Sequence, residues 1–222
     1  MKSSLKIYFL LCIFLIFSTY STKQSKENFS FFFPIKKIVI VNSVATNLSK
    51  FKSDLRFLIN SSLFFLNEEK ILITISSYDF ISSVQIKKIY PNTLKVIIFE
   101  KIPVATKIID KRKFYVTKDM EKINFIDLKA YENLPSIFGN YRNFNSFYDN
   151  LKKNNFKMKK IKAFYYFDVG RWDIVLKNEK IIKFPEKNYL DLLPKIISMI
   201  EDSNFSKYKV FDLRIKDQLI LK

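Results

Sequence analysis

The side chains that most enzymes use for catalysis are scarce in this sequence. There is no histidine, and the single cysteine, Cys12, lies in an apolar run near the N-terminus. This inventory argues against Ser-His-Asp and Cys-His nucleophiles and against the usual zinc sites. With Gly139 and Gly170 as the only glycines, a Gly-rich phosphate loop is also excluded. A carboxylate pair could still catalyse, but a sequence does not show which carboxylates meet. We predict a protein that is not an enzyme and needs no metal or cofactor.

The chain is strongly basic. Its 222 residues include 39 Lys and Arg against 21 Asp and Glu, a net charge of +18. Such an excess often indicates a nucleic-acid or anionic membrane partner. Here nearly all the positive charges are lysines that are dispersed along the chain, in a composition rich in Lys, Asn, Ile and Phe that is typical of AT-rich coding sequence. Nucleic-acid interfaces instead cluster their charge and use arginine, so we predict no nucleic-acid partner.

A charged joint follows one apolar stretch. The residues from Glu100 to Ala105 read EKIPVA, and Pro103 has no N–H and a fixed φ, so a regular strand cannot continue through it. Residue 102 is held extended by the proline that follows it. We predict a joint between two domains at Glu100, Lys101, Pro103 and Ala105. Two roles stay open for it: a structural hinge in which a basic group satisfies Glu100, or a docking surface.

An apolar run, LKIYFLLCIFLIFSTY, occupies residues 5–20. It is short for a membrane-spanning helix, which needs about 20 apolar residues. A cleaved signal peptide and an uncleaved signal-anchor are both open, and both export residues 25–222. We favour the anchor. The expected organisation is a cytoplasmic tail at 1–6, a transmembrane signal-anchor at 7–23, a linker at 24–34, a first domain at 35–102 and a second at 103–222.

The first domain is predicted to have the order strand, helix, helix, strand, strand. Residues 35–41 form a β-branched run, and residues 94–98 alternate in the manner of a strand after a Pro91-Asn92 turn. Asn47 and Asn67 are expected helix N-caps. The apolar faces of the two helices are expected to be Leu48, Phe51, Leu55, Leu58 and Ile59 in the first, and Ile71, Leu72 and Ile75 in the second.

The second domain is predicted to combine an antiparallel sheet with helices, so the fold class is α+β. Apolar residues at helical spacing predict one helix near 144–151 and another over 189–200, kinked at Pro194. Strands are expected at 113–117, 123–126, 160–167, 171–177 and 180–184, with two short strand-like pieces over 211–222. Trp172 is expected in the core.

The order and spacing of several short motifs over residues 35–221 resemble those of the FtsQ (DivIB) family of bacterial cell-division proteins. Three positions depart from the family, which usually has glycine where this chain has Asn42, Lys122 and Glu179. Asn42 and Asn178 are expected to adopt the left-handed backbone instead. The motifs are Phe64-Phe65-x-Asn67, Tyr90-Pro91-Asn92-Thr93-Leu94, Glu100-Lys101-x-Pro103-x-Ala105, Leu134-Pro135-x-x-x-Gly139, Arg171-Trp172 and Asp212-Leu213-Arg214.

The resemblance implies a fold and a function. It implies a POTRA domain followed by a β-domain, in a single-pass inner-membrane protein whose C-terminal part is periplasmic and which acts at the division septum. The protein would be a scaffold of the divisome that recruits FtsB- and FtsL-like proteins to regulate septal cell-wall synthesis. The alternatives are an exported basic domain that binds anionic surfaces or wall polymers, and a POTRA module of a secretion or assembly system.

The resemblance also implies a docking site near the C-terminus. A partner strand would add to an edge strand over residues 216–221, with Arg214 forked onto a partner carboxylate and Ile215 as apolar anchor. Alternatively, Arg214 pairs internally with Asp212, and Leu219 and Leu221 belong to the core. The candidate partner-binding residues are Arg214, Ile215, Lys216, Asp217, Gln218, Leu219 and Arg171.

Overall fold

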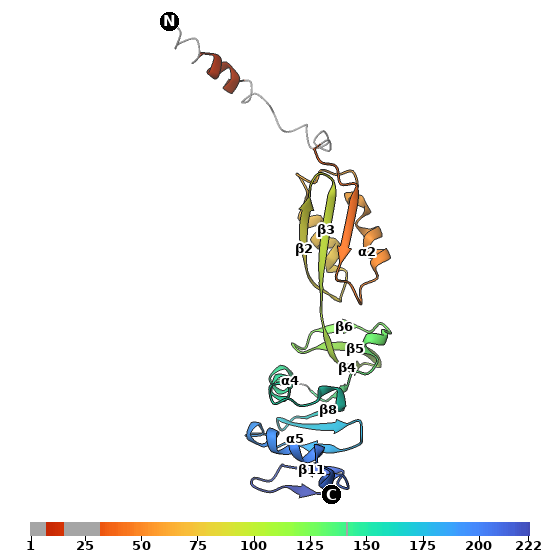
Figure 1. Ribbon diagram of the computed structural model, residues 1–222, viewed down its shortest axis with the longest axis vertical. Helices are drawn as coiled ribbons and strands as arrows, with labels where there is room; N and C mark the ends of the chain where they lie inside the picture. The colour runs from red at the N-terminus through yellow and green to blue at the C-terminus, as the bar shows by residue number, and fades with distance from the viewer. Residues whose placement is uncertain (1–7, 16–31, 141) are drawn as a thin grey trace. The chain divides into compact units, whose positions relative to one another are not determined.

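The computed structural model describes residues 8–15, 32–140 and 142–222. The chain divides into two compact units, Met1–Glu100 and Lys101–Lys222 (Figure 1).

The expected signal-anchor falls largely outside the described residues. Of the segment 7–23, residues 8–15 are described, and they are helical. The expected tail at 1–6 and most of the linker at 24–34 also lie outside. In the part of the chain that is described, no helix combines the length and the apolar character needed to cross a bilayer.

The first unit has the predicted order of strand, helix, helix, strand, strand. Its sheet has the order β1-β3-β2, in which β1 runs parallel and β2 antiparallel to the central β3 (Figure 1). The elements are β1 (Lys37–Val41), α2 (Leu48–Asp54), a 3-10 turn (Arg56–Leu58), α3 (Glu68–Ser76), β2 (Ile81–Ile89) and β3 (Thr93–Glu100).

Local sequence explains where these helices begin. The Asn47 side chain accepts a hydrogen bond from the N–H of Lys50, and the Asn67 side chain accepts one from Glu69. Each cap satisfies a backbone donor that the first helical turn leaves without a partner. Glu68 and Glu69 also place negative charge at the positive end of the α3 dipole. Both predicted N-caps are confirmed.

The predicted helix faces are partly wrong. Phe51, Ile71 and Ile75 are buried against the alternating residues of β3, as expected. Leu48 and Leu72, however, are 45% and 54% exposed. Both helices are short, at 7 and 9 residues, so only a narrow stripe of each reaches the three-stranded sheet.

The second unit contains a nine-stranded sheet with the order β12-β11-β10-β9-β8-β7-β4-β5-β6. Its helices are α4 (Phe144–Lys153) and α5 (Leu193–Glu201), and 3-10 turns lie at Lys129–Tyr131, Met158–Lys160, Leu190–Leu192 and Ser203–Phe205. The strands are β4 (Pro103–Ile109), β5 (Arg112–Thr117), β6 (Lys122–Asn124), β7 (Ser136–Phe138), β8 (Ile161–Phe167), β9 (Arg171–Leu176), β10 (Ile181–Lys183), β11 (Val210–Asp212) and β12 (Ile220–Leu221).

The sheet is mixed, so the prediction of an antiparallel sheet is wrong. The pairs β4/β7, β7/β8 and β10/β11 are parallel. Parallel neighbours need a crossover connection, and α4 joins β7 to β8 while α5 joins β10 to β11. Pro194 does not kink a helix as predicted. It lies in the first turn of α5, where its missing N–H costs no helical hydrogen bond.

The core of the second unit is rich in aromatic rings. Phe147 of α4 stacks on Trp172 of β9, with ring centroids 5.1 Å apart. Trp172 is 5% exposed, which confirms the expectation that it is a core residue. The core also contains Phe164 of β8, Phe184 directly after β10, and Ile196 of α5. Helices α4 and α5 therefore cover one face of the sheet.

Left-handed backbone occurs at one of the two predicted asparagines. Asn42 has a φ of 65°, as expected for a residue in place of glycine. In the hairpin between β9 and β10, however, the positive φ of 66° belongs to Glu179 and not to Asn178. The N–H of Glu179 closes the turn on the carbonyl of Leu176, so Glu179 is the last residue of the turn, at the position where the family usually has glycine.

Candidate functional site

Glu100, the last residue of β3, is held by backbone donors. Its carboxylate accepts hydrogen bonds from the N–H groups of Val44, Ala45 and Thr46, at 2.8 to 3.1 Å. The expectation that a basic side chain satisfies Glu100 is therefore wrong. Burial alone would raise the pKa of Glu100, but the hydrogen bonds from Ala45, Thr46 and Val44 outweigh it and hold the pKa below its usual value.

The other joint residues are fixed within the second unit. Lys101 lies 3.0 Å from Glu121 as an ion pair. Pro103 begins β4 opposite Thr117, and the register of this pair shifts before Ala105, which is buried. Such a shift is where a proline without an N–H is tolerated in a strand. Each of the four residues thus has a structural role in its own unit, and a docking role for them stays a prediction.

The Glu100 contacts predict a pH-dependent loop. Because the folded pKa lies below the ordinary 4.5, the stabilisation is complete above pH 4.5 and is lost as pH falls through the folded value. We expect the amide proton shifts of Val44, Ala45 and Thr46 to titrate together below pH 4.5 in NMR spectra. Glu100→Gln should abolish this titration and cost about 1–2 kcal/mol, since the amide offers one neutral acceptor oxygen in place of the two charged oxygens of the carboxylate.

A matched control is Glu69→Gln, which changes an exposed carboxylate in the first turn of α3. It should leave the titration of the three amides unchanged and cost at most about 0.5 kcal/mol through the helix dipole. Amide shifts in the unmodified protein that stay flat down to pH 2 would contradict the assignment of the 44–46 loop to Glu100.

The C-terminal candidate residues lie on a loop, which corrects the predicted edge strand at 216–221. Strand β11 ends at Asp212, and only Ile220 and Leu221 form β12. Residues 214–219 connect the two strands, and Asp217 has a φ of 59° in the turn. Hydrogen bonds between Val210 and Lys222 extend the pairing of β11 with the last residues. In the strand order of the sheet, β12 is the outermost strand at this end.

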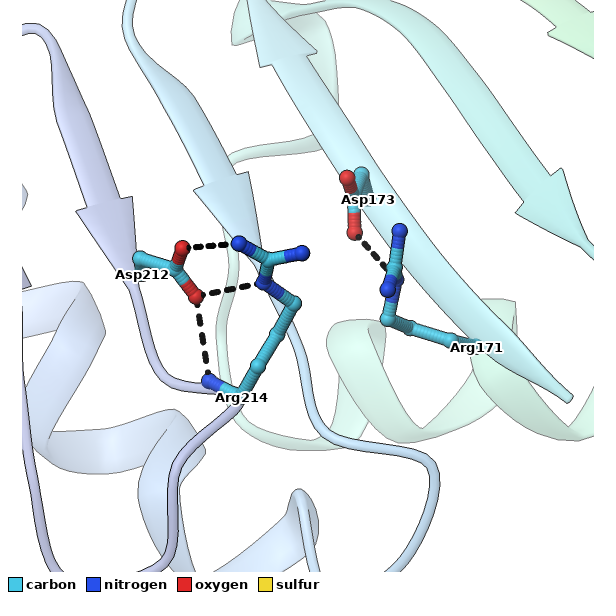
Figure 2. A network of polar contacts seen from close by, with 4 residues as sticks. All are labelled: Arg171, Asp173, Asp212 and Arg214. Atoms are coloured by element: carbon cyan, nitrogen blue, oxygen red, sulfur yellow. Dashed lines mark hydrogen bonds and ion pairs between the residues drawn. The ribbon is translucent and has the colours of Figure 1, made fainter. Parts of the chain in front are cut away.

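Arg214 forms an ion pair with Asp212, which is the internal pairing that the sequence left open as an alternative. Nε and Nη2 of Arg214 donate to the two carboxylate oxygens at 2.8 and 2.6 Å, and its backbone N–H donates at 3.2 Å (Figure 2). These hydrogen bonds lower the pKa of Asp212. The Arg214 side chain is still 42% exposed, so the guanidinium is fixed in orientation and accessible from solvent.

Arg171 belongs to the same polar cluster. Its Nε lies 3.3 Å from Oδ1 of Asp173 (Figure 2), and its guanidinium covers the Phe167 ring at 4.2 Å. Lys183 of β10 is in register with both Asp173 of β9 and Asp212 of β11. Residues in register point to the same face of a sheet. The five charged groups Arg171, Asp173, Lys183, Asp212 and Arg214 therefore form one cluster, which we call the polar cluster.

Asp173 is a buried member of the polar cluster whose hydrogen bonding within the protein is incomplete. It is 5% exposed, and burial raises its pKa despite the nearby charges of Arg171, Lys183 and Arg214. Although Arg171 lies within ion-pair distance, the alignment is poor and Oδ1 of Asp173 has no hydrogen-bond partner. A buried carboxylate oxygen without a hydrogen bond from the protein carries a desolvation cost.

The polar cluster lies on the face of the sheet opposite to α4 and α5. Trp172 and Ile174 point into the core beneath these helices, and Asp173 between them points the other way. The register continues this row through Tyr165 to Phe138, which are 37% and 45% exposed. The rings of Phe138 and Tyr165 stack at 4.7 Å. Charged and aromatic side chains therefore share one face that no described helix covers.

The loop residues line a groove of about 690 Å³ beside α5. The groove brings together all six candidates of residues 214–219, but Arg171 is not among its lining residues. Ile215 is 51% exposed, and Leu219 is partly buried against the core. Sequence reasoning missed the residues that α5 and the loop before it contribute, namely Glu186, Lys187, Asp191, Leu192, Lys195, Ile196 and Met199.

Comparison with known proteins identifies the first unit. Residues 33–101 match the family model of the POTRA domain, FtsQ-type. The chain is 26% identical over 166 residues to the cell division protein FtsQ of Rickettsia typhi and 28% identical over 167 residues to that of Rickettsia conorii. Each match covers 73% of this chain and 62% of the relative, so the chain spans less than two thirds of the length of these relatives. The resemblance predicted from the motifs is confirmed, since the chain contains an FtsQ-type POTRA domain and is similar to FtsQ over most of its length.

Proposed function

We propose that this protein is a non-enzymatic scaffold of the bacterial cell-division machinery. Its N-terminal apolar run would anchor it in the inner membrane as a single-pass protein, with both units on the periplasmic side at the septum. The C-terminal unit would hold FtsB- and FtsL-like partners and so regulate septal wall synthesis. The similarity to proteins named cell division protein FtsQ supports the process, and the partners follow from the resemblance of the motifs.

The observation that carries the docking proposal is the outer strand β12. It is at one end of the nine-stranded order and pairs with β11 through Ile220 and Leu221. An outer strand presents backbone N–H and C=O groups that an extended partner segment can complete. Beside it, the loop 214–219 presents Ile215, which is 51% exposed. A partner strand on β12 would bring its neighbouring side chains onto this loop.

We propose that the Arg214 guanidinium contacts the partner in the orientation that Asp212 already fixes, and that it does not form a two-pronged ion pair with a partner carboxylate. Two of its five N–H groups are used on Asp212, which leaves the outer part of the guanidinium for a partner carbonyl or carboxylate. Reversing its charge would place two carboxylates together and disturb β11. Ile215 is therefore the better position for a test, because its side chain is exposed and its replacement removes no internal ion pair.

We expect Ile215→Glu to weaken partner binding by about 30-fold or more, the loss typical of an interface hot spot of ~2 kcal/mol. The measurement is a titration of the full-length chain in detergent with the periplasmic segments of FtsB and FtsL from the same organism. The matched control is Ile108→Glu, which makes the same change at a 67% exposed residue of β4. It should leave the affinity within about threefold, as for surface changes away from an interface.

Two results would contradict the proposal. A folded wild-type chain that binds neither segment would remove the partner claim. Equal losses of affinity in Ile215→Glu and Ile108→Glu would show that the decrease is non-specific and that the β12 edge is not the site. Circular dichroism spectra of both variants confirm that the units are folded in either case.

A further inference from the structure

One end of the first unit is built from three separate segments, 32–37, 59–66 and 86–93. Ile35 donates its N–H to the carbonyl of Ser61 and accepts from Asn60, both at 2.9 Å. The N–H groups of Lys36 and Lys37 both donate to the carbonyl of Asn92. The three segments are therefore tied together at the point where the chain joins the sheet from its N-terminal side. We call this region the aromatic end.

The aromatic end exposes an unusual number of large apolar side chains. Phe64 and Phe65 are 58% and 55% exposed, and their rings meet edge to face. Contiguous exposed apolar surface in a soluble unit indicates an interaction site. The exposed apolar residues of the three segments are Phe32, Phe33, Ile59, Phe64, Phe65, Ile89 and Tyr90.

The charge of the aromatic end has one sign. The three segments contain Lys36, Lys37, Lys87 and Lys88, and they contain no aspartate or glutamate. Glu68, at the start of α3, lies 3.8 Å from Lys88 as an ion pair. The three segments therefore combine exposed rings with positive charge only.

A basic hollow adjoins the aromatic end. It has a volume of about 450 Å³ and lies between β1 and α2. Four of its eight lining residues are cationic, namely Lys36, Lys37, Lys52 and Arg56, and Ser49 and Ser53 contribute hydroxyl groups. Its lining contains no carboxylate. Amine, guanidinium and hydroxyl donors around one hollow suit a phosphate group.

We propose that the aromatic end rests on the surface of an anionic lipid bilayer, with its aromatic rings in the interface and a lipid phosphate in the basic hollow. Phenylalanine rings insert into the boundary between headgroups and acyl chains, and lysines next to them are attracted to anionic lipid. The combination of inserted rings and flanking cations is that of peripheral membrane surfaces.

Chain continuity favours a bilayer over a soluble acidic partner. The aromatic end begins 12 residues after Tyr20, the last residue of the apolar run, and 12 residues span at most about 40 Å. If the apolar run is a membrane anchor, this short tether keeps the aromatic end close to the bilayer at a high effective concentration. The inference rests on the proposed anchor for this tether, and it is independent of the docking site in the second unit.

The test measures the depth of an introduced tryptophan in the full-length chain reconstituted into vesicles. Phe64→Trp should lose about half of its emission to brominated phospholipids when the vesicles contain phosphatidylglycerol, since interfacial side chains lie ~5–10 Å into the headgroup boundary. The control is Phe99→Trp, at a ring that is 48% exposed near the other end of β3, which should stay unquenched. Trp172, buried in the second unit, gives a constant background that the unmodified chain measures.

A charge variant tests the basic hollow. In the Phe64→Trp chain, the triple change Lys36→Glu, Lys52→Glu and Arg56→Glu should reduce quenching to the level seen with phosphatidylcholine vesicles. The triple change Lys50→Glu, Lys70→Glu and Lys95→Glu alters net charge equally within the same unit, outside both the aromatic end and the hollow. It should leave most of the quenching intact.

The outcomes separate this proposal from the proposed function. If the chain floats with the vesicles while the tryptophan at position 64 stays unquenched, the bilayer proposal is overturned and the anchor stands. If the chain does not float, the anchor and the bilayer proposal both fail. Quenching that is equal in both triple variants would overturn the role of the hollow. Partner binding at the β12 edge is measured separately in detergent, so neither result decides the other.

Discussion

Replacing Gly139 by alanine is expected to destabilise the second unit by about 3 kcal/mol or more. Gly139 follows β7 with a φ of +86°, a conformation that costs other residues about 1–2 kcal/mol. An added Cβ would also lie 2.1 Å from the carbonyl oxygen of Tyr166, a backbone atom of β8. Because β7 and β8 are paired, the contact can be relieved only by moving one strand, and such overpacking adds about 1–3 kcal/mol.

The measurement is denaturant unfolding of the full-length chain followed by Trp172 fluorescence. Trp172 is the only tryptophan and lies in the core of the second unit, so its emission reports on that unit alone. Gly170→Ala is a control with a similar φ of +88°, where the nearest atom to the added Cβ is the flexible Glu186 side chain at 3.2 Å. It should cost only the ~1–2 kcal/mol of the backbone conformation. If both variants lost the same free energy of unfolding, the close approach of β8 to Gly139 would not contribute to the cost of the Gly139 substitution.

Replacing Phe147 by alanine is expected to cost about 3–5 kcal/mol, the range for removing a buried phenylalanine. Phe147 is 2% exposed and contacts four aromatic residues, Trp172, Phe164, Phe184 and Tyr189. Through these rings α4 contacts β8, β9 and the segment that directly follows β10. The resulting cavity would also loosen β9, which carries Arg171 and Asp173 of the polar cluster.

Because Phe147 stacks on Trp172, fluorescence would report the loss of the ring itself. Unfolding of this variant is therefore followed by far-ultraviolet circular dichroism. The control is Phe138→Ala, a phenylalanine that is 45% exposed and stacks on Tyr165 on the opposite face. It should cost about 1 kcal/mol, the contribution of an exposed aromatic pair. A cost below that of Phe138→Ala for the Phe147 variant would mean that α4 does not seal the core.

The first unit could be predicted closely because its signals are local. The alternation of Leu94, Val96 and Ile98 marks β3, and all three residues are buried. Asn47 and Asn67 start the two helices by bonding to residues two or three positions ahead. Side-chain periodicity and capping depend on neighbours within one or two turns, so both can be recognised directly in the sequence.

Strand direction and the edge of the second unit could not be predicted in this way. Short strands such as β7, β10 and β11 have three residues each, which is too few to show a pattern. Whether they pair parallel or antiparallel depends on how the crossovers through α4 and α5 pack on the sheet. The edge strand predicted at 216–221 is shortened to Ile220 and Leu221, because Arg214 is held back on Asp212 and the positive φ of Asp217 turns the chain.

The sequence by itself determined the scarcity of catalytic groups, the order of elements in the first unit and the motifs that the FtsQ-type domain match confirms. Only the tertiary structure decided the partners of the candidate residues. Glu100 meets backbone groups more than 50 positions away, the register of β9, β10 and β11 assembles the polar cluster, and three distant segments form the aromatic end. The physical reason is that periodicity and capping are properties of neighbouring residues. Strand register and contacts between segments that are distant in the sequence depend instead on the packing of the whole unit.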